Sequence, residues 1–575
     1  MKSLKIFRFL ILAAFLSLAS CGNTTQYLTA EDPGTATIKI YKNNNSTSKD
    51  RYIAPKNVEI EHTLNSLNGK LSDSLTSNCP STGDVNLLII PVKMPQNELF
   101  MDDDKRTQIL SDLEIAFFAD SNDKLGHPSL KSFLKESSFG KINISGTITD
   151  WFDLNDIDIT AVEQISSEKE NVIGDKILPA AVEWASNTQN IDVKDFDSDK
   201  NGAIDAVYLI YDFYDLESYY DFIVNSEPNI DNSAFSTNLT TITSSNAVTE
   251  FSKDNPVPTT YTWMSFAEFY KGYSVLNSDN RYELLNIENI KIDTHPLIHE
   301  QGHLFGLNDF ASTTDPNSHP TGKSTMMDES VGDFDSYSKM ILGWITPYVV
   351  YGTSEILLPK VNFSNNCVIV IPTNYDEISQ KVETAIMQDK LDNFSYSFNP
   401  FSEYLMIDLY TPDNLNYLDA FKIPANFKQN AVQSSGVRIH HVDSRIFKAN
   451  YVVSDLGTTI NYVDGYEWDG KSLTKNQTIL CPISNSDIEQ NYYQLPEEFN
   501  HYDRIRLLEA NQINNFDNDA WANETSYFDV STEPFKIEKF GYRFFNGNYT
   551  FNNGIELPFN IKVETLKGVN VNENK

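Results

Sequence analysis

Residues 299–309 read HEQGHLFGLND, a stretch that holds two histidines, two acidic residues and a glycine at fixed offsets. Residues four apart share one face of a helix, so His299 and His303 can both direct a ring nitrogen toward one metal ion. Glu300 adjoins the first histidine, and its carboxylate can reach a metal-bound water and take its proton. The spacing therefore predicts a helix that carries a Zn²⁺ site, with Glu300 as the general base.

The third ligand is expected after a turn. A catalytic zinc ion usually has three protein ligands and one open position. Gly306 can end the helix three residues past His303 and return the chain to the metal, because glycine adopts left-handed backbone without a Cβ penalty. Asp309 is then the predicted third ligand. Histidine is common at this place in the metzincin pattern H-E-x-x-H-x-x-G-x-x-H, so aspartate is a variation, and a solvated acidic turn is the alternative.

Residues before the motif indicate where the helix begins. Asp293 or Thr294 can cap the free amides, and Pro296 suits a first turn. Pro296 also argues against an earlier start, so His295 is not expected on the metal-binding face. Gly302 costs about 1 kcal/mol relative to alanine inside a helix, which indicates close packing or substrate approach at that point.

Three stretches together resemble one protein family. They are IHEQGHLFGLNDF at 298–310, STMMD at 324–328 and SYSKMILGWI at 336–345. In this respect the sequence is similar to the immune inhibitor A family of secreted bacterial metallopeptidases, which carry H-E-x-x-H-x-x-G-x-x-D. The resemblance implies zinc ligation by His299, His303 and Asp309, and catalysis by Glu300.

The resemblance also implies a methionine in the turn beneath the metal. Met327 is the residue assigned to it, and the sequence leaves Met326 as the alternative. Buried methionine often only fills core space, so the position after the zinc motif is what favours the turn. Tyr337 is a weaker candidate for contacting a developing oxyanion, and core packing is the favoured interpretation of that residue.

The likeness to the family is good from about residue 80 to 345 and looser to about 563. Residues 80–92 resemble its first core strand and 129–141 its following helix and turn, while 403–408 and 436–443 resemble later strands. The implied fold class is α+β: a metzincin-like zinc peptidase domain with a mixed sheet and an active-site helix, followed by a β-rich C-terminal region.

Sequence patterns and the family resemblance together imply four parts of the chain. Residues 1–20 are a predicted lipoprotein signal peptide, and 21–79 a flexible tether or short pro-segment. Residues 80–350 form the predicted peptidase domain, with a polar insertion near the site at 216–258, and 351–575 form the β-rich C-terminal region of the peptidase unit.

The N-terminus predicts export. Lys2, Lys5 and Arg8 precede an apolar run at 9–18 that is too short for a permanent membrane span. LASC at 18–21 resembles the bacterial lipobox, so Cys21 is expected to become the lipid-modified first residue, carrying palmitate among its acyl chains. The mature protein would face the cell exterior, or the periplasm in a double-membrane envelope. A plain secreted protein is the alternative.

A second metal signal lies in DFDSDKNGAID at 195–205. Carboxylate and amide oxygens alternate there as candidate Ca²⁺ ligands, and glycine permits the sharp turn. These ligands are Asp197, Asp199, Asn201 and Asp205. The twelfth position counted from Asp197 is Tyr208, where an EF-hand requires glutamate, so a complete EF-hand is excluded. An ordinary acidic turn is the alternative.

The remaining cysteines and histidines give weaker signals. Cys79, Cys367 and Cys481 allow at most one internal disulfide, and Cys367 with Cys481 is the expected pair. Cys79 raises the idea of an inhibitory thiolate on the zinc, although a buried or partnered cysteine is favoured. His440 and His441 are adjacent in a predicted strand, so they point to opposite faces, and one packed and one solvated histidine are expected.

Composition limits the range of partners. At 575 residues two or more subdomains are expected, and the formal charge of −36 disfavours nucleic acid as a partner. The sequence predicts a lipid-anchored zinc metalloendopeptidase that acts on protein or peptide substrates, with a monomer assumed. A surface binding lipoprotein that has lost catalysis and a zinc hydrolase with a non-peptide substrate are the alternatives.

Overall fold

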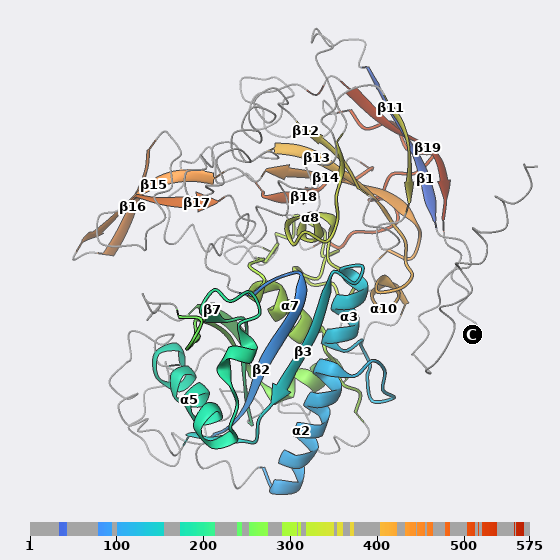
Figure 1. Cartoon of the computed structure of the whole chain (residues 1–575). Helices are drawn as coiled ribbons and strands as arrows, with labels where there is room; N and C mark the ends of the chain where they lie inside the picture. Colours follow the sequence, from blue (N-terminus) through green and yellow to red (C-terminus); the bar gives the residue numbers. More distant parts are fainter. Residues whose placement is uncertain are drawn as a thin grey trace, which may run out of the picture.

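The architecture is mixed α/β, with several sheets and few helices (Figure 1). The computed structural model describes residues 34–42, 79–94, 101–154, 173–212, 239–243, 252–273, 290–307, 309–311, 318–349, 354–359, 368–372, 403–421, 432–443, 446–454, 457–463, 478–482, 503–511, 516, 520–536, 557 and 559–568.

The first part of the chain is built around one sheet with the order β3-β2-β6-β9-β7, to which β4 adds beside β2. Its strands are β2 (Gly83–Lys93), β3 (Ile142–Ile148), β4 (Phe152–Asp153), β6 (Val207–Tyr211), β7 (Leu239–Thr243) and β9 (Thr260–Ser265). β3, β2, β6 and β9 run parallel, whereas β7 is antiparallel to β9. The insertion predicted at 216–258 therefore contributes a strand of the main sheet.

Both faces of this sheet are covered, because its central strands are apolar on both sides. In β2, Val85, Leu87 and Ile89 join one hydrophobic cluster, and Leu88, Ile90 and Val92 join another. This alternation follows from the two-residue period of a strand, and the continuous apolar sequence is typical of a buried parallel strand.

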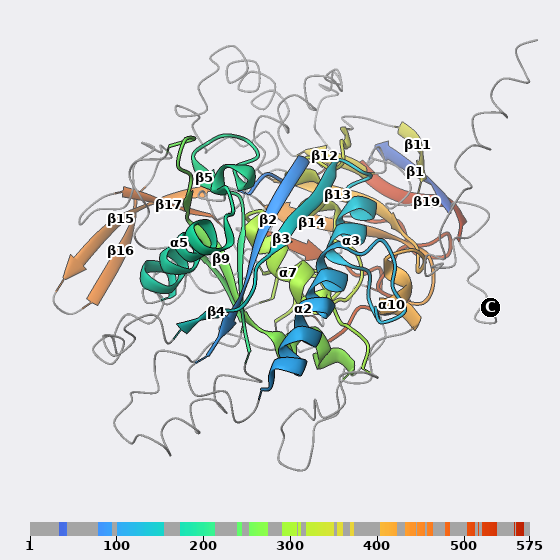
Figure 2. The same ribbon diagram turned by 60° about the horizontal axis from the view of Figure 1, so that its bottom comes forward.

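Helices pack on both faces (Figure 2). The first cluster includes side chains of α2 (Asp103–Phe118), α3 (Leu130–Ser137) and α7 (His295–Leu304), and the second includes side chains of α5 (Leu178–Gln189). Side chains cap two of these helices: Asp102 accepts from the amide of Lys105 before α2, and Ser129 accepts from the amide of Ser132 before α3. Short elements complete this part: η4 (Ile173–Ile177), η5 (Val193–Phe196), β5 (Ala203–Ile204), β8 (Val257–Pro258) and η7 (Phe266–Tyr273).

The second part is rich in strands. A five-stranded sheet has the order β10-β12-β13-β14-β18, and two three-stranded sheets have the orders β11-β1-β19 and β16-β15-β17. The strands are β1 (Thr35–Lys42), β10 (Tyr348–Val349), β11 (Ser354–Pro359), β12 (Val368–Pro372), β13 (Glu403–Tyr410), β14 (Gly436–Asp443), β15 (Ile446–Ser454), β16 (Gly457–Val463), β17 (Thr478–Pro482), β18 (Ile505–Leu507) and β19 (Phe559–Lys567). Two short helices accompany them, α8 (Ser336–Ile341) and α10 (Asn416–Phe421).

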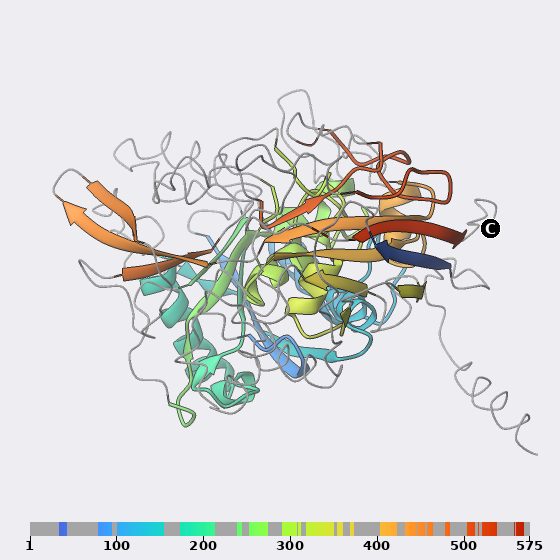
Figure 3. The same cartoon turned by 90° about the horizontal axis from the view of Figure 1, so that it is seen from above.

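The strand β1 lies within residues 21–79, where a flexible tether or a short pro-segment is expected. It lies between β11 and β19, and Figure 3 shows this dark blue strand beside the dark red C-terminal strand. Ala36, Ile38 and Ile40 are buried in a hydrophobic cluster with residues of β13 and β14. The short alternating pattern TATIKIYK is surrounded by Asn, Thr and Ser, so composition over a longer window hides it.

The two parts share hydrophobic contacts across the expected boundary at 350/351. Tyr404 and Met406 of β13 and Val442 of β14 belong to the same buried cluster as the core of α2, α3 and α7. The C-terminal strands therefore pack directly against the part of the molecule that holds α7.

Candidate metal centre

The zinc motif lies on α7, whose start differs from the expected one. The helix includes His295, because a proline at position 296 falls in the first turn, where its missing N–H is tolerated. Asp293 accepts hydrogen bonds from the amide of His295 at 3.1 Å and from its Nδ1 at 2.7 Å. His295 is thus helical but held at the helix start by Asp293. Thr294 makes no side-chain cap.

The end of α7 turns the chain back toward the helix. Gly306 has a φ of 92°, which a side chain would disfavour. The amide of Gly306 donates to the carbonyl of His303 at 2.8 Å, and the amide of Leu307 donates to the carbonyl of Gly302 at 2.9 Å. This pair of bonds is a Schellman motif, which satisfies free carbonyls at the helix end. The turn leads to Asp309.

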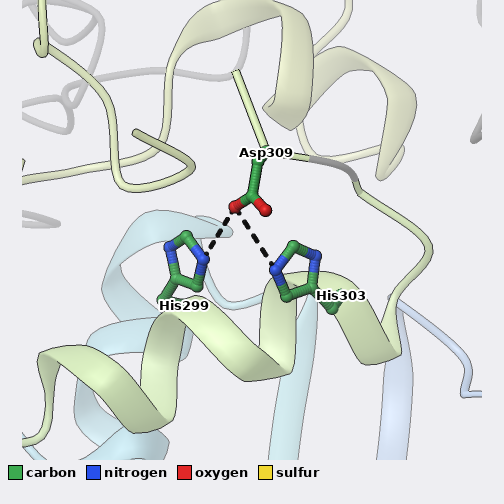
Figure 4. Close-up of side chains that lie close together, drawn as sticks. All are labelled: His299, His303 and Asp309. Atoms are coloured by element: carbon green, nitrogen blue, oxygen red, sulfur yellow. Dashed lines mark ion pairs between the residues drawn. The ribbon is translucent and has the colours of Figure 1, made fainter. Parts of the chain in front are cut away.

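Three ligand atoms converge over α7 (Figure 4). Asp309 Oδ1 lies 3.0 Å from His299 Nε2 and 3.4 Å from His303 Nε2. All three atoms lie within 4.8 Å of one another. Ligands about 2.0 to 2.1 Å from a tetrahedral zinc ion are about 3.3 Å apart, so the spacing and the donor set both fit Zn²⁺.

Backbone carbonyls fix the tautomer of both histidines. His299 Nδ1 lies 2.8 Å from the carbonyl oxygen of Met326, and His303 Nδ1 lies 2.8 Å from that of Leu307. A carbonyl can only accept, so each Nδ1 carries the hydrogen and donates it. The lone pair of each neutral ring is therefore on Nε2, the atom that faces Asp309, as metal ligation requires.

The electrostatics of the three groups favour a positive charge between them. Burial disfavours protonation of His303, but the Asp309 carboxylate outweighs it and, with Glu300, raises the pKa of His303 to about 9. The pKa of His299 is raised for the same reason. Burial alone would raise the pKa of Asp309, yet the two imidazoles hold it well below its usual range. A bound cation would replace the protons that His299 and His303 carry on the atoms facing Asp309.

Glu300 lies on the same helix and is 4% exposed. Its charge raises the pKa values of both His299 and His303, so the carboxylate is close to the ligand set without belonging to it. This arrangement suits a group that exchanges protons beside a metal ion.

Met327 packs directly against α7. A Cβ built on Gly302 would lie 2.4 Å from Met327 Sδ, so the glycine makes room for the thioether. The adjacent Met326 has a different contact, since its carbonyl accepts from His299. The carbonyl of Met327 also accepts from the amide of Phe310, at 2.7 Å. The close approach at Gly302 is therefore packing by Met327, and the same turn supports both His299 and the segment after Asp309.

The buried side of α7 holds a polar chain that the motif does not reveal. Tyr208 donates to Gln301 Oε1 at 2.7 Å, and Gln301 Nε2 donates to Cys79 Sγ at 3.5 Å. Cys79 is buried, and burial raises the pKa of its thiol well above the ordinary value. Cys79 is thus a protonated core residue beside Gln301, which argues against an inhibitory thiolate. The side chains of Cys367 and Cys481 lie outside the described part of the chain.

The acidic loop brings Asp197, Asp199 and Asp205 within one metal-sized cluster. Asp197 accepts from the amides of Asn201 and Gly202, both at 2.9 Å, and Gly202 has a φ of 89°. The side chain of Asn201 donates to Asp199 and accepts from the amide of Ala203. Burial raises the pKa of Asp205 to about 7 and also raises that of Asp199.

Other predicted residues do not belong to the group formed by His299, His303 and Asp309. Tyr337 is buried in the core, and its ring packs against Phe310. His440 and His441 are both buried, with 1% and 3% exposure, which corrects the expectation of one solvated histidine. They lie in β14, inside the five-stranded sheet, whose alternate residues are buried in two different hydrophobic clusters. Cys21 lies outside the described residues. Among the described residues, no helix combines the length and apolar character needed to cross a membrane.

No protein-family model matches the chain, and no curated protein sequence is significantly similar to it.

Proposed function

We propose that the protein is a metzincin-like zinc metalloendopeptidase that hydrolyses peptide bonds in protein or peptide substrates. The observation that carries the proposal is the spacing of His299 Nε2, His303 Nε2 and Asp309 Oδ1, together with the carbonyl bonds that free both Nε2 lone pairs. The resemblance to the immune inhibitor A family supports it as well.

In the proposed reaction, bound Zn²⁺ would polarise the scissile carbonyl and lower the pKa of the attacking water. Glu300 accepts the proton of that water and returns it to the leaving amine. Its burial keeps bulk water away from the transferred proton, which strengthens electrostatic interactions at the site. His299 and His303 are held by the carbonyls of Met326 and Leu307 and need no reorganisation.

We propose that an extended substrate binds at the end of the main sheet where β7 lies. β7 is the antiparallel end strand of the described sheet and packs against α7. An extended peptide can add to such an edge through main-chain hydrogen bonds, which would place internal peptide bonds beside the helix. This is why we propose an endopeptidase rather than an enzyme limited to chain ends.

The test compares zinc content and cleavage of a mixed peptide library by the wild type, Glu300→Gln and Glu183→Gln. Glu183 is an exposed residue of α5 on the other face of the sheet and serves as the matched control. The proposal expects Glu300→Gln to keep zinc and lose at least about 100-fold in kcat, while Glu183→Gln behaves like the wild type. Equal cleavage by Glu300→Gln would contradict the mechanism.

The competing function is a surface binding lipoprotein that retains the site without catalysis. Glu300 favours the enzyme, because a binding protein has no need for a buried carboxylate beside the ligand set. Zinc in the wild type without any cleavage of the library would favour the binding protein. A zinc hydrolase with a non-peptide substrate is the remaining alternative.

Export and anchoring through Cys21 remain part of the proposal and rest on the lipobox-like sequence alone. Cys21→Ser is expected to release the protein from membranes or block its processing. Unaltered membrane association of that variant would refute the lipid anchor.

A further inference from the structure

A third histidine, outside the zinc motif, joins the two segments that form the site. His127 is 3% exposed and lies in the connection between α2 and α3. Its Nδ1 is 2.9 Å from Thr294 Oγ1, and its Nε2 is 2.8 Å from the carbonyl oxygen of Val331. Thr294 immediately precedes α7, and Val331 follows the methionine turn by four residues.

The partners of the His127 ring show which ring nitrogen carries the hydrogen. The carbonyl of Val331 can only accept, so His127 Nε2 carries the hydrogen that it donates. Burial lowers the pKa of His127 to about 4, so the ring is neutral near pH 7 and Nδ1 keeps its lone pair. Nδ1 lies 2.9 Å from the hydroxyl oxygen of Thr294, whose single hydrogen is donated to the carbonyl of Pro128. The imidazole thus contacts one segment through each ring nitrogen, Thr294 through Nδ1 and Val331 through Nε2.

The ring itself is held in place. It stacks on Phe133 of α3 with ring centroids 5.6 Å apart. The connection beside it pairs with the segment before α7, since Gly126 donates to Ile292 at 2.9 Å and Ile292 donates to Lys124 at 2.8 Å. Because these contacts fix the position of His127, the residue can set the distance between the start of α7 and the loop around Val331.

The loop that contains Val331 is also bound by the C-terminal region. The amide of Val331 donates to Asp419 at 3.3 Å, and the amide of Asp333 donates to Asn416 Oδ1 at 3.1 Å. Both acceptors belong to α10. The peptide groups around Val331 are thus fixed by α10 on one side and by His127 on the other. The methionine turn that precedes them supplies the carbonyl that orients His299.

We propose that His127 is a positioning residue of the zinc site, which fixes the start of α7 relative to the loop that carries Met327 and the His299 acceptor. The proposal rests on the proposed function. His299 lies five residues, or about 7.5 Å of helix, beyond Thr294, so a shift at the helix start moves its ligand atom directly. Residues that orient metal ligands typically contribute about 10- to 100-fold to metal affinity or activity.

The test uses three variants. His127→Phe keeps an aromatic ring over Phe133 and removes both hydrogen bonds. His127→Gln retains an amide near the position of Nε2, so it can keep the bond to Val331. Thr294→Val removes the other contact with little change in volume and serves if His127→Phe does not fold. Leu178→Ala, in the core of α5 on the opposite face of the sheet, is the destabilised control.

Zinc affinity is measured by chelator competition, and kcat and KM are measured with a peptide substrate. Both measurements are made at a temperature where circular dichroism shows that every variant is folded. We expect His127→Phe to bind zinc about 10- to 100-fold more weakly and to lose kcat with little change in KM. His127→Gln and Thr294→Val should be intermediate, and Leu178→Ala should lower Tm without changing zinc affinity. Wild-type affinity and kcat in His127→Phe, with only Tm lowered, would overturn the proposal.

Hydrogen exchange separates this proposal from the proposed function. His127→Phe should speed exchange both at the start of α7 and at residues 326–331, whereas Leu178→Ala should affect neither. If the wild type binds no zinc and cleaves nothing, the proposed function fails. In that case the hydrogen-exchange rates of His127→Phe test the positioning role by themselves. Unchanged exchange rates at both segments would overturn that role.

Discussion

Gly302 and Met327 are matched to each other: a Cβ on the glycine would lie 2.4 Å from the methionine sulfur. Real Cβ atoms essentially never lie within 3.0 Å of another heavy atom, so a side chain at 302 requires the Met327 side chain to shift. The carbonyl of Met326, next to that sulfur, orients His299. The glycine in the middle of α7 thus makes room for a side chain of the same turn that bonds His299.

Gly302→Ala is therefore expected to destabilise the protein, although alanine is the better helix former by about 1 kcal/mol. Overpacking of this kind typically costs about 1 to 3 kcal/mol. Chemical denaturation and zinc content measure the two effects. When it is combined with Met327→Ala, the total loss should be smaller than the sum of the two single losses, because the double variant has no clash. A more stable Gly302→Ala variant with full zinc content would refute the packing account.

Zinc binding is expected to release protons. The pKa of His303 is raised to about 9 beside Asp309, so in chelator-treated protein at pH 7 this ring is protonated and must lose its proton to bind metal. Affinity should therefore rise with pH up to about 9. Calorimetry of zinc binding in two buffers of different ionisation enthalpy counts the protons, and we expect about one or more. Zinc binding with no proton release would contradict an ion pair between protonated His303 and Asp309.

The buried neutral His127 should make stability depend on pH. Its pKa is lowered from 6.5 to about 4 by burial, so between these values the unfolded chain binds a proton that the folded chain does not. Stability is unaffected above pH 6.5 and falls as pH decreases to 4, by roughly 3 kcal/mol at most. Asp293 and His295 also act on this ring and are unchanged in His127→Gln. The free energy of unfolding, measured with urea at several pH values, should therefore depend less steeply on pH in His127→Gln than in the wild type. The same pH dependence in both proteins would contradict a neutral, buried His127.

The acidic loop is proposed to bind Ca²⁺. Asp205 has a raised pKa because burial leaves its charge poorly solvated, and a divalent cation would relieve this. Changing Asp197 and Asp199 both to Ala should abolish bound calcium and leave zinc in place. Metal analysis of purified protein decides this, and unchanged calcium content would end the proposal.

The geometry of the motif could be predicted because it is local. Four-residue spacing fixes the shared face of His299 and His303, and the glycine at 306 fixes the turn toward Asp309. The partners of His127 could not be predicted, since they lie 167 and 204 residues away and one is a backbone carbonyl. The same holds for β1, whose sheet partners come from 354–359 and 559–567.

The choice between the two methionines shows the same limit. Sequence places both after the zinc motif, and only the contact with Gly302 distinguishes Met327 from Met326. The burial of both His440 and His441 also depends on the layers that cover the two faces of β14, which strand periodicity alone does not specify.

The most direct test of the central claim is metal reconstitution. Protein stripped of metal by a chelator is titrated with Zn²⁺ while cleavage at internal bonds of a peptide is followed by mass spectrometry. We predict no cleavage without metal, recovery that rises linearly to one zinc equivalent, and no recovery in Glu300→Gln. Full cleavage by the metal-free protein would contradict the account.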